Sequence, residues 1–68
     1  MRTKKLIEKL EGLATFYALA AKDTDNLIAA AKQRGEVSSV SFHTGKKIAF
    51  ELAFHNLDRV IKEIKNEG

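Results

Sequence analysis

The amino-acid sequence predicts an all-α fold, a helical hairpin in which a long helix, a loop and a second helix follow one another. Three observations predict it. Apolar residues recur at steps of three and four along two long segments, proline is absent, and Gly35 interrupts the chain between these segments. Steps of three and four return side chains to one face of an α-helix, whereas strands alternate every second residue. We expect residues 1–68 to form one small domain.

The first helix is predicted from Thr3 to Arg34. Its apolar stripe keeps one phase, and a second set of residues seven apart widens it on one side. The stripe consists of Leu6, Leu10, Leu13, Tyr17, Ala20, Leu27 and Ala31, and the second set consists of Ile7, Ala14, Ala21 and Ile28. Gly35 follows as a residue suited to the left-handed conformation that closes a helix, and Lys32 places positive charge in the last turn, where the helix dipole favours it.

An alternative with three helices is left open by residues 23–26. These residues are weak helix formers and good helix N-caps, so a break into two shorter helices near Asp23 is an option. Against a break, the apolar phase does not shift across them, and no glycine lies between Lys22 and Asn26 to close a first helix. We therefore predict that residues 23–26 are helical or only gently kinked.

Residues 36–45 are predicted to connect the helices as a packed loop. Three apolar side chains of this segment are expected to fold back over the helix ends. The second helix is predicted from about Gly45 to Asn66, and either Ser41 or Thr44 is expected to act as its cap.

The second helix carries more apolar surface than one neighbouring helix can cover. Within residues 48–54 only Glu51 is polar, and a helix that is apolar nearly all round must be buried on more than one side. We therefore predict a homodimer in which two hairpins form a four-helix bundle. The open alternative is a monomer in which three helices wrap this segment. The candidate core or dimer-interface residues are Ile48, Phe50, Leu52, Phe54, Leu57 and Ile61.

Enzymatic chemistry is not expected from this sequence. The chain has no cysteine, which excludes disulfides and thiolate metal sites. Glu51, His55 and Asp58 share one helix face, but a metal site in a helical bundle needs further inward-facing glutamates that the sequence does not provide. We predict no catalytic residue, no metal, no cofactor and no small-molecule substrate.

The sequence also predicts a cytoplasmic protein that does not bind membranes. The basic N-terminus has the charge of a secretory signal, yet Glu8 and Glu11 interrupt the apolar run that such a signal needs. No segment approaches the roughly 18 consecutive apolar residues of a membrane span. Acidic and basic residues are mixed along both helices, unlike the strongly basic face of a membrane-surface helix.

Charge and size leave two kinds of function. The net charge is +3, from 12 basic and 9 acidic residues that are interleaved along the chain. Our first hypothesis is a non-catalytic binding or regulatory protein, of the adaptor or inhibitor type, that acts through a helical surface on a macromolecular partner. The alternative is a small DNA- or RNA-binding regulator whose basic loop end contacts phosphates. The candidate residues for binding a partner or nucleic acid are Lys32, Arg34, His43, Lys46 and Lys47.

Overall fold

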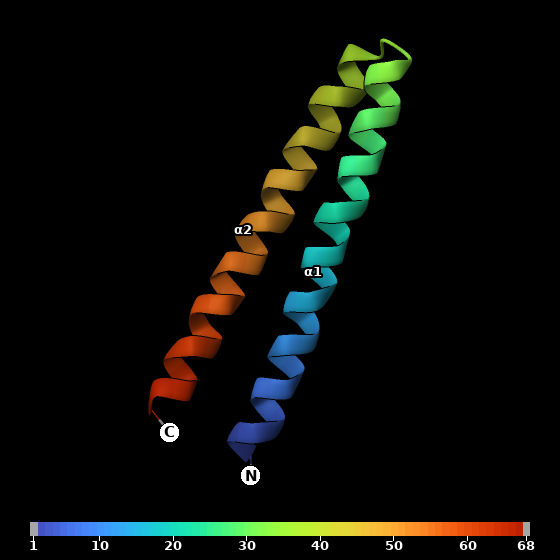
Figure 1. Cartoon of the computed structure of the whole chain (residues 1–68). Helices are drawn as coiled ribbons and strands as arrows, with labels where there is room; N and C mark the ends of the chain where they lie inside the picture. Colours follow the sequence, from blue (N-terminus) through green and yellow to red (C-terminus); the bar gives the residue numbers. More distant parts are fainter. Residues whose placement is uncertain (1, 68) are drawn as a thin grey trace.

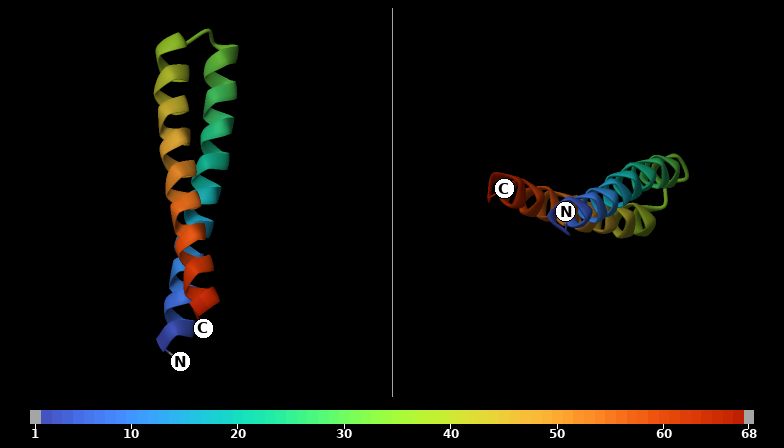
Figure 2. Two further views of the ribbon diagram at one scale, coloured as in Figure 1. Left: turned by 90° about the vertical axis from the view of Figure 1, so that its left-hand side faces the viewer. Right: turned by 90° about the horizontal axis from the view of Figure 1, so that it is seen from below.

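The computed structural model describes residues 2–67, which form two antiparallel α-helices (Figure 1). Helix α1 spans Arg2–Gln33 and helix α2 spans Val37–Glu67. The helices run side by side, so that the two ends of the chain lie at one end of the molecule and the turn lies at the other (Figure 2). The hairpin measures 51 × 14 × 11 Å. The predicted all-α hairpin is confirmed, and within residues 2–67 neither helix is apolar over a length that would cross a membrane.

Helix α1 continues without interruption through residues 23–26, so the prediction of one long helix is confirmed and the three-helix alternative is wrong. Thr24 is only 2% exposed, and its hydroxyl donates a hydrogen bond to the carbonyl oxygen of Ala20 at 2.8 Å. A threonine bonded in this way needs no partner outside its own helix, which lets a polar residue lie against α2 without an unsatisfied group.

The turn between the helices closes α1 at Gly35, as the sequence predicts. Gly35 has a φ of +69°, in the left-handed region that glycine enters without the strain of a side chain. Its N–H donates to the carbonyl oxygen of Lys32 at 3.1 Å, and the N–H of Glu36 donates to that of Ala31 at 3.0 Å. These two bonds form a Schellman motif, which satisfies the last carbonyls of α1 while reversing the chain within three residues.

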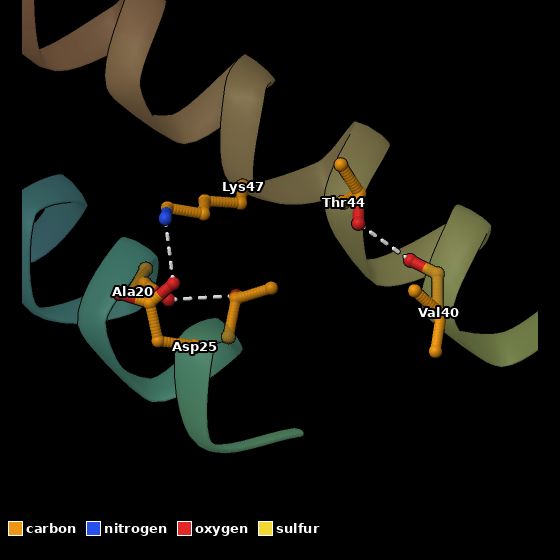
Figure 3. Close-up of polar contacts among 6 residues, drawn as sticks. Ala20, Asp25, Val40, Thr44 and Lys47 are labelled. Atoms are coloured by element: carbon orange, nitrogen blue, oxygen red, sulfur yellow. Dashed lines mark hydrogen bonds and ion pairs between the residues drawn. The ribbon is translucent and has the colours of Figure 1, made fainter. Parts of the chain in front are cut away.

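Helix α2 begins at Val37 and not near Gly45, so the predicted loop over residues 36–45 is wrong. The first helical bond runs from the N–H of Val40 to the carbonyl oxygen of Glu36 at 3.0 Å, directly after the turn. Thr44 lies inside the helix and does not cap it, since its hydroxyl donates back to the carbonyl oxygen of Val40 at 2.7 Å (Figure 3). The Schellman turn is short enough to place residues 37–45 alongside α1, where they gain from helical packing.

The two helices meet along a seam with a strict seven-residue repeat, the pattern of an antiparallel coiled coil. Every seam residue is buried or half-buried. The seam consists of Ile7, Leu10, Ala14, Tyr17, Ala21, Thr24, Ile28 and Ala31 from α1, and of Val40, His43, Lys47, Phe50, Phe54, Leu57, Ile61 and Ile64 from α2.

The core that this seam forms is thin. Among the described residues the fully buried apolar side chains are those of Ala14, Ala21, Ala31 and Ile61, and no large side chain is completely enclosed. The seam combines the second apolar set of α1 with Leu10, Tyr17 and Ala31 of the predicted main stripe. Leu6, Leu13 and Leu27 of that stripe remain exposed. One hairpin therefore leaves a large part of its apolar surface in contact with solvent.

Candidate functional site

The seam divides the surface of the hairpin into two edges of different chemistry. One edge, which we call the polar edge, contains residues that directly follow seam residues in the sequence. On α1 these seam residues are Leu10, Tyr17, Thr24 and Ala31, and on α2 they are His43, Phe50, Leu57 and Ile64. The polar edge consists of Glu11, Ala18, Asp25 and Lys32 on α1, and of Thr44, Glu51, Asp58 and Lys65 on α2. Lys65 Nζ and Glu11 Oε2 are 3.2 Å apart, a contact between residues far apart in sequence that shows that these positions of the two helices share one edge.

A second ion pair connects the helices at the polar edge, nearer the turn. Lys47 Nζ reaches out of the seam to Asp25 Oδ1 at 2.6 Å (Figure 3). The hydrogen bond that Lys47 donates to Asp25, and then the negative charge of this carboxylate, raise the pKa of Lys47 above its usual value. The lysine therefore keeps its charge at neutral pH while its aliphatic stem lies in the seam between the helices.

A shallow hollow lies on the polar edge near the middle of the hairpin. It exists because Ala18 and Ala21 leave space beside Phe54, and Glu51 and His55 form its outer wall. Glu51 and His55 are exposed and stand one turn apart on α2. Within residues 2–67 no three Asp, Glu, His or Cys side chains converge as metal ligands do.

The opposite edge is apolar. It consists of positions 6, 13, 16, 20 and 27 on α1 and of positions 42, 49, 53 and 60 on α2. Steps of three, four and seven residues place these side chains on one side of each helix. We call this surface the apolar face and define it by its six large side chains, which are between 39% and 63% exposed. They are Leu6, Leu13, Phe16, Leu27, Phe42 and Val60.

The predicted core or dimer-interface residues fall into two groups in the structure. Four of them, Phe50, Phe54, Leu57 and Ile61, lie in the seam, where Phe50 packs against Tyr17 with ring centroids 6.2 Å apart. The other two, Ile48 and Leu52, are 52% and 58% exposed and lie away from the seam on the outer side of α2. The apolar excess of residues 48–54 is therefore shared between the seam and the outer surface.

The predicted basic residues of the loop end do not form one patch. Lys32 lies on the polar edge, whereas Lys46 lies on the side of the apolar face, with Nζ 5.4 Å from the ring centroid of Phe42. Arg34 Nε is paired with Glu36 Oε1 at 2.7 Å, and Lys47 is paired with Asp25. His43 is half-buried in the seam, and its Nδ1 has no hydrogen-bond partner among the described residues.

Sequence reasoning did not locate the apolar face, although its signal is present. Leu6, Leu13 and Leu27 precede the seam residues of α1 by one position each, so two apolar sets run side by side along this helix. In the sequence alone, both sets form one wide stripe. A repeat in which two adjacent positions of every seven are apolar indicates two separate contacts, one within the hairpin and one outside it.

Comparisons of the chain with family models, with curated proteins and with solved structures find no match. Any function assigned to this hairpin therefore depends on its own residues.

Proposed function

We propose that this chain is a small non-catalytic binding or regulatory protein, of the adaptor or inhibitor type, that acts through a helical surface on a macromolecular partner. The observation that carries the proposal is that ten large apolar side chains within residues 2–67 are exposed, on a hairpin whose fully buried core consists mainly of alanines. Extended apolar surface on a small soluble protein is costly and marks interaction sites. Two packed helices hold such side chains at fixed spacing, which suits recognition of a partner.

We also propose that the chain works as a homodimer of two hairpins in a four-helix bundle, in the cytoplasm. A chain of 68 residues buries only about 60% of its unfolded surface, so that association is a common way for it to gain stability. A non-catalytic role is supported by the hollow on the polar edge, where Glu51 and His55 are both exposed to solvent, whereas catalytic groups are usually tuned by burial.

The test is to compare binding of a protein partner with binding of nucleic acid. The hairpin is immobilised, retained proteins are identified, and each is purified and titrated against the hairpin at about 50 and 300 mM salt. We expect a protein partner whose affinity changes little between the two salt concentrations, because apolar contacts are only weakly screened.

The nucleic-acid alternative makes a different prediction for the same titration. Binding of duplex DNA or single-stranded RNA that weakens by orders of magnitude between these salt concentrations would support it. Its candidate residues are spread over both edges, and Arg34 and Lys47 already have acidic partners, so no single basic surface favours it. The titration of Lys32→Gln separates the alternatives, since Lys32 lies on the polar edge, away from the apolar face, and only nucleic-acid binding should be weakened by removing its charge.

A further inference from the structure

We infer that the apolar face is the surface on which a second copy of this chain docks, and that the polar edge faces outward in the resulting bundle. The inference rests on the homodimer of the proposed function and deepens it by naming the surface that the two copies share. Three properties of the hairpin support it: its total surface area, the position of the apolar face beside the seam, and the balance of charges around that face.

The hairpin exposes more surface area than a compact monomer of the same mass. Its accessible surface is 5282 Å². A compact monomer of 7.6 kDa is expected to expose about 4,300 Å². The excess is roughly 1,000 Å², close to the 800 Å² or so that each partner contributes to a stable protein–protein interface. One further copy of the chain, packed along one face, is therefore enough to bring the surface of each hairpin to the usual range.

The apolar face is an exposed surface, rich in large apolar side chains, that is continuous with the existing core. Seam residues that border it, including Tyr17, Phe50 and Leu57, are only half-buried, so their outer sides open onto this face. A second hairpin placed here would cover these residues and the apolar face together, which extends one core instead of creating another.

The other exposed apolar side chains cannot form a single docking surface. Leu19 lies on the side of α1 that points away from the seam, and Leu52 lies on the corresponding side of α2. These two side chains therefore point in opposite directions from the hairpin. Ile48 lies one turn from Leu52 on α2, so these exposed apolar side chains stand singly or as a pair, and such small groups are ordinary on a surface and require no partner.

The charged residues around the apolar face suit a partner with the same surface. Within the two helices, the positions at the same seven-residue spacing as the apolar face hold three basic and three acidic residues, although the whole chain has a net charge of +3. These residues are Arg2, Lys9, Lys46, Asp23, Glu63 and Glu67. A surface with no net charge does not repel its own copy, and each base can find an acid across a two-fold interface.

The first experiment measures the mass of the full chain in solution by sedimentation at about 10 to 100 μM. We expect the wild type to sediment as a dimer of twice 7.6 kDa. The variant Leu13→Glu with Leu27→Glu places two charges on the apolar face and is expected to sediment as a monomer. Leu52→Glu is the matched control, a leucine of similar exposure on the outer side of α2, and is expected to remain a dimer.

A second experiment uses the unmodified protein, so its result does not depend on whether a variant folds. Hydroxyl-radical footprinting measures how readily each side chain is oxidised. In the dimer we expect Leu13, Phe16 and Phe42 to be oxidised several-fold more slowly than their exposure in one hairpin implies. Leu19 and Leu52 are expected to react as exposed side chains.

The outcomes separate the homodimer from the surface that it uses. A wild-type protein that is monomeric at 100 μM would overturn both, while the proposed binding of a macromolecular partner would still be decided by its own titration. A dimer that Leu52→Glu dissociates, with Leu13 and Phe16 fully reactive, would overturn the apolar face alone. A dimer dissociated only by the double variant, with the apolar face protected, would support the inference.

Discussion

Thr24, His43 and Lys47 bring polar groups into a seam that is otherwise apolar or aromatic, and the structure accommodates each in its own way. Thr24 bonds to its own helix, and Lys47 extends to Asp25 at the polar edge. The Nδ1 atom of His43 has no partner among the described residues. Polar residues at seam positions lower stability but restrict the register in which two helices can pair. The Asp25–Lys47 pair is well placed for this role because it links the two helices.

Removing the Asp25 carboxylate should destabilise the hairpin at neutral pH and not at strongly alkaline pH. The raised pKa of Lys47 means that the pair contributes stability below the usual lysine pKa of 10.5, and that this contribution is lost as the pH rises through the higher pKa of the folded state. Thermal unfolding of Asp25→Asn and of the wild type should therefore differ at pH 7 and converge above that pKa. Asp58→Asn, which removes an ion pair to Lys62 within one helix, is the control, and an equal effect of both substitutions at pH 7 would contradict the prediction.

Replacing Gly35 or Gly12 by alanine should change the free energy of unfolding in opposite directions. Gly35→Ala should lower the free energy of unfolding by about 1 to 2 kcal/mol, because a Cβ atom strains the left-handed backbone at φ +69°. Gly12→Ala should raise it by about 1 kcal/mol, since Gly12 lies within α1 and nothing lies within 4 Å of an added Cβ. Urea unfolding of both variants measures the difference, and a stabilising Gly35→Ala would show that the turn is not formed as described.

At the scale of the helices, the sequence predicts α1 well and the beginning of α2 poorly. The continuous apolar phase overrides the weak helix propensity of residues 23–26, and Gly35 identifies the turn. Residues 37–44 contain three serines, which locally favour caps and turns, so only their packing against α1 makes them helical. The two adjacent apolar sets of α1 are offset by one position. Which residues pack in the seam depends on contacts with α2, and these contacts cannot be read from the pattern of α1 alone.

Proline substitutions distinguish the observed beginning of α2 from a loop. Ser41→Pro should cost about 3 kcal/mol or more, since position 41 lies inside the helix, where proline removes a hydrogen bond and clashes with the preceding turn. Val37→Pro should be tolerated, because the first position of a helix has no intrahelical N–H bond to lose. Circular dichroism and urea unfolding measure both. Equal tolerance of the two prolines would mean that residues 37–44 are not a stable helix.

At the scale of the whole molecule, the excess apolar surface could be predicted from the sequence, but its position could not. The near-continuous apolar residues of α2 correctly indicate that one hairpin cannot cover them, and Ile48 and Leu52 are indeed exposed. Six of the exposed large apolar side chains, however, lie on the apolar face, which combines residues of α1 and α2. It becomes visible only when the pairing of the helices is known, because the pairing determines which edges lie together.

The stability of the molecule should depend on protein concentration if two hairpins share a core. Ligands and partner subunits that bind only the folded state stabilise it by mass action. We expect the unfolding midpoint of the wild type to rise by about 5 to 10 °C over a hundredfold increase in concentration. The same series with Leu13→Glu and Leu27→Glu should show no such rise. A wild-type midpoint that is constant over this range would contradict the dimer.

The short turn at Gly35 also predicts where folding begins. Closing a loop costs least entropy when few residues separate the two segments, so we expect the seam residues that flank the turn, Ala31 and Val40, to meet first and the seam to form from the turn towards the chain ends. The half nearest the turn holds the polar seam residues and most of the small ones, together with Ile28, whereas most of the bulky apolar seam residues lie in the distant half. We therefore expect folding to start where loop closure costs least entropy but packing contributes least energy, and the distant half of the hairpin to stabilise the product.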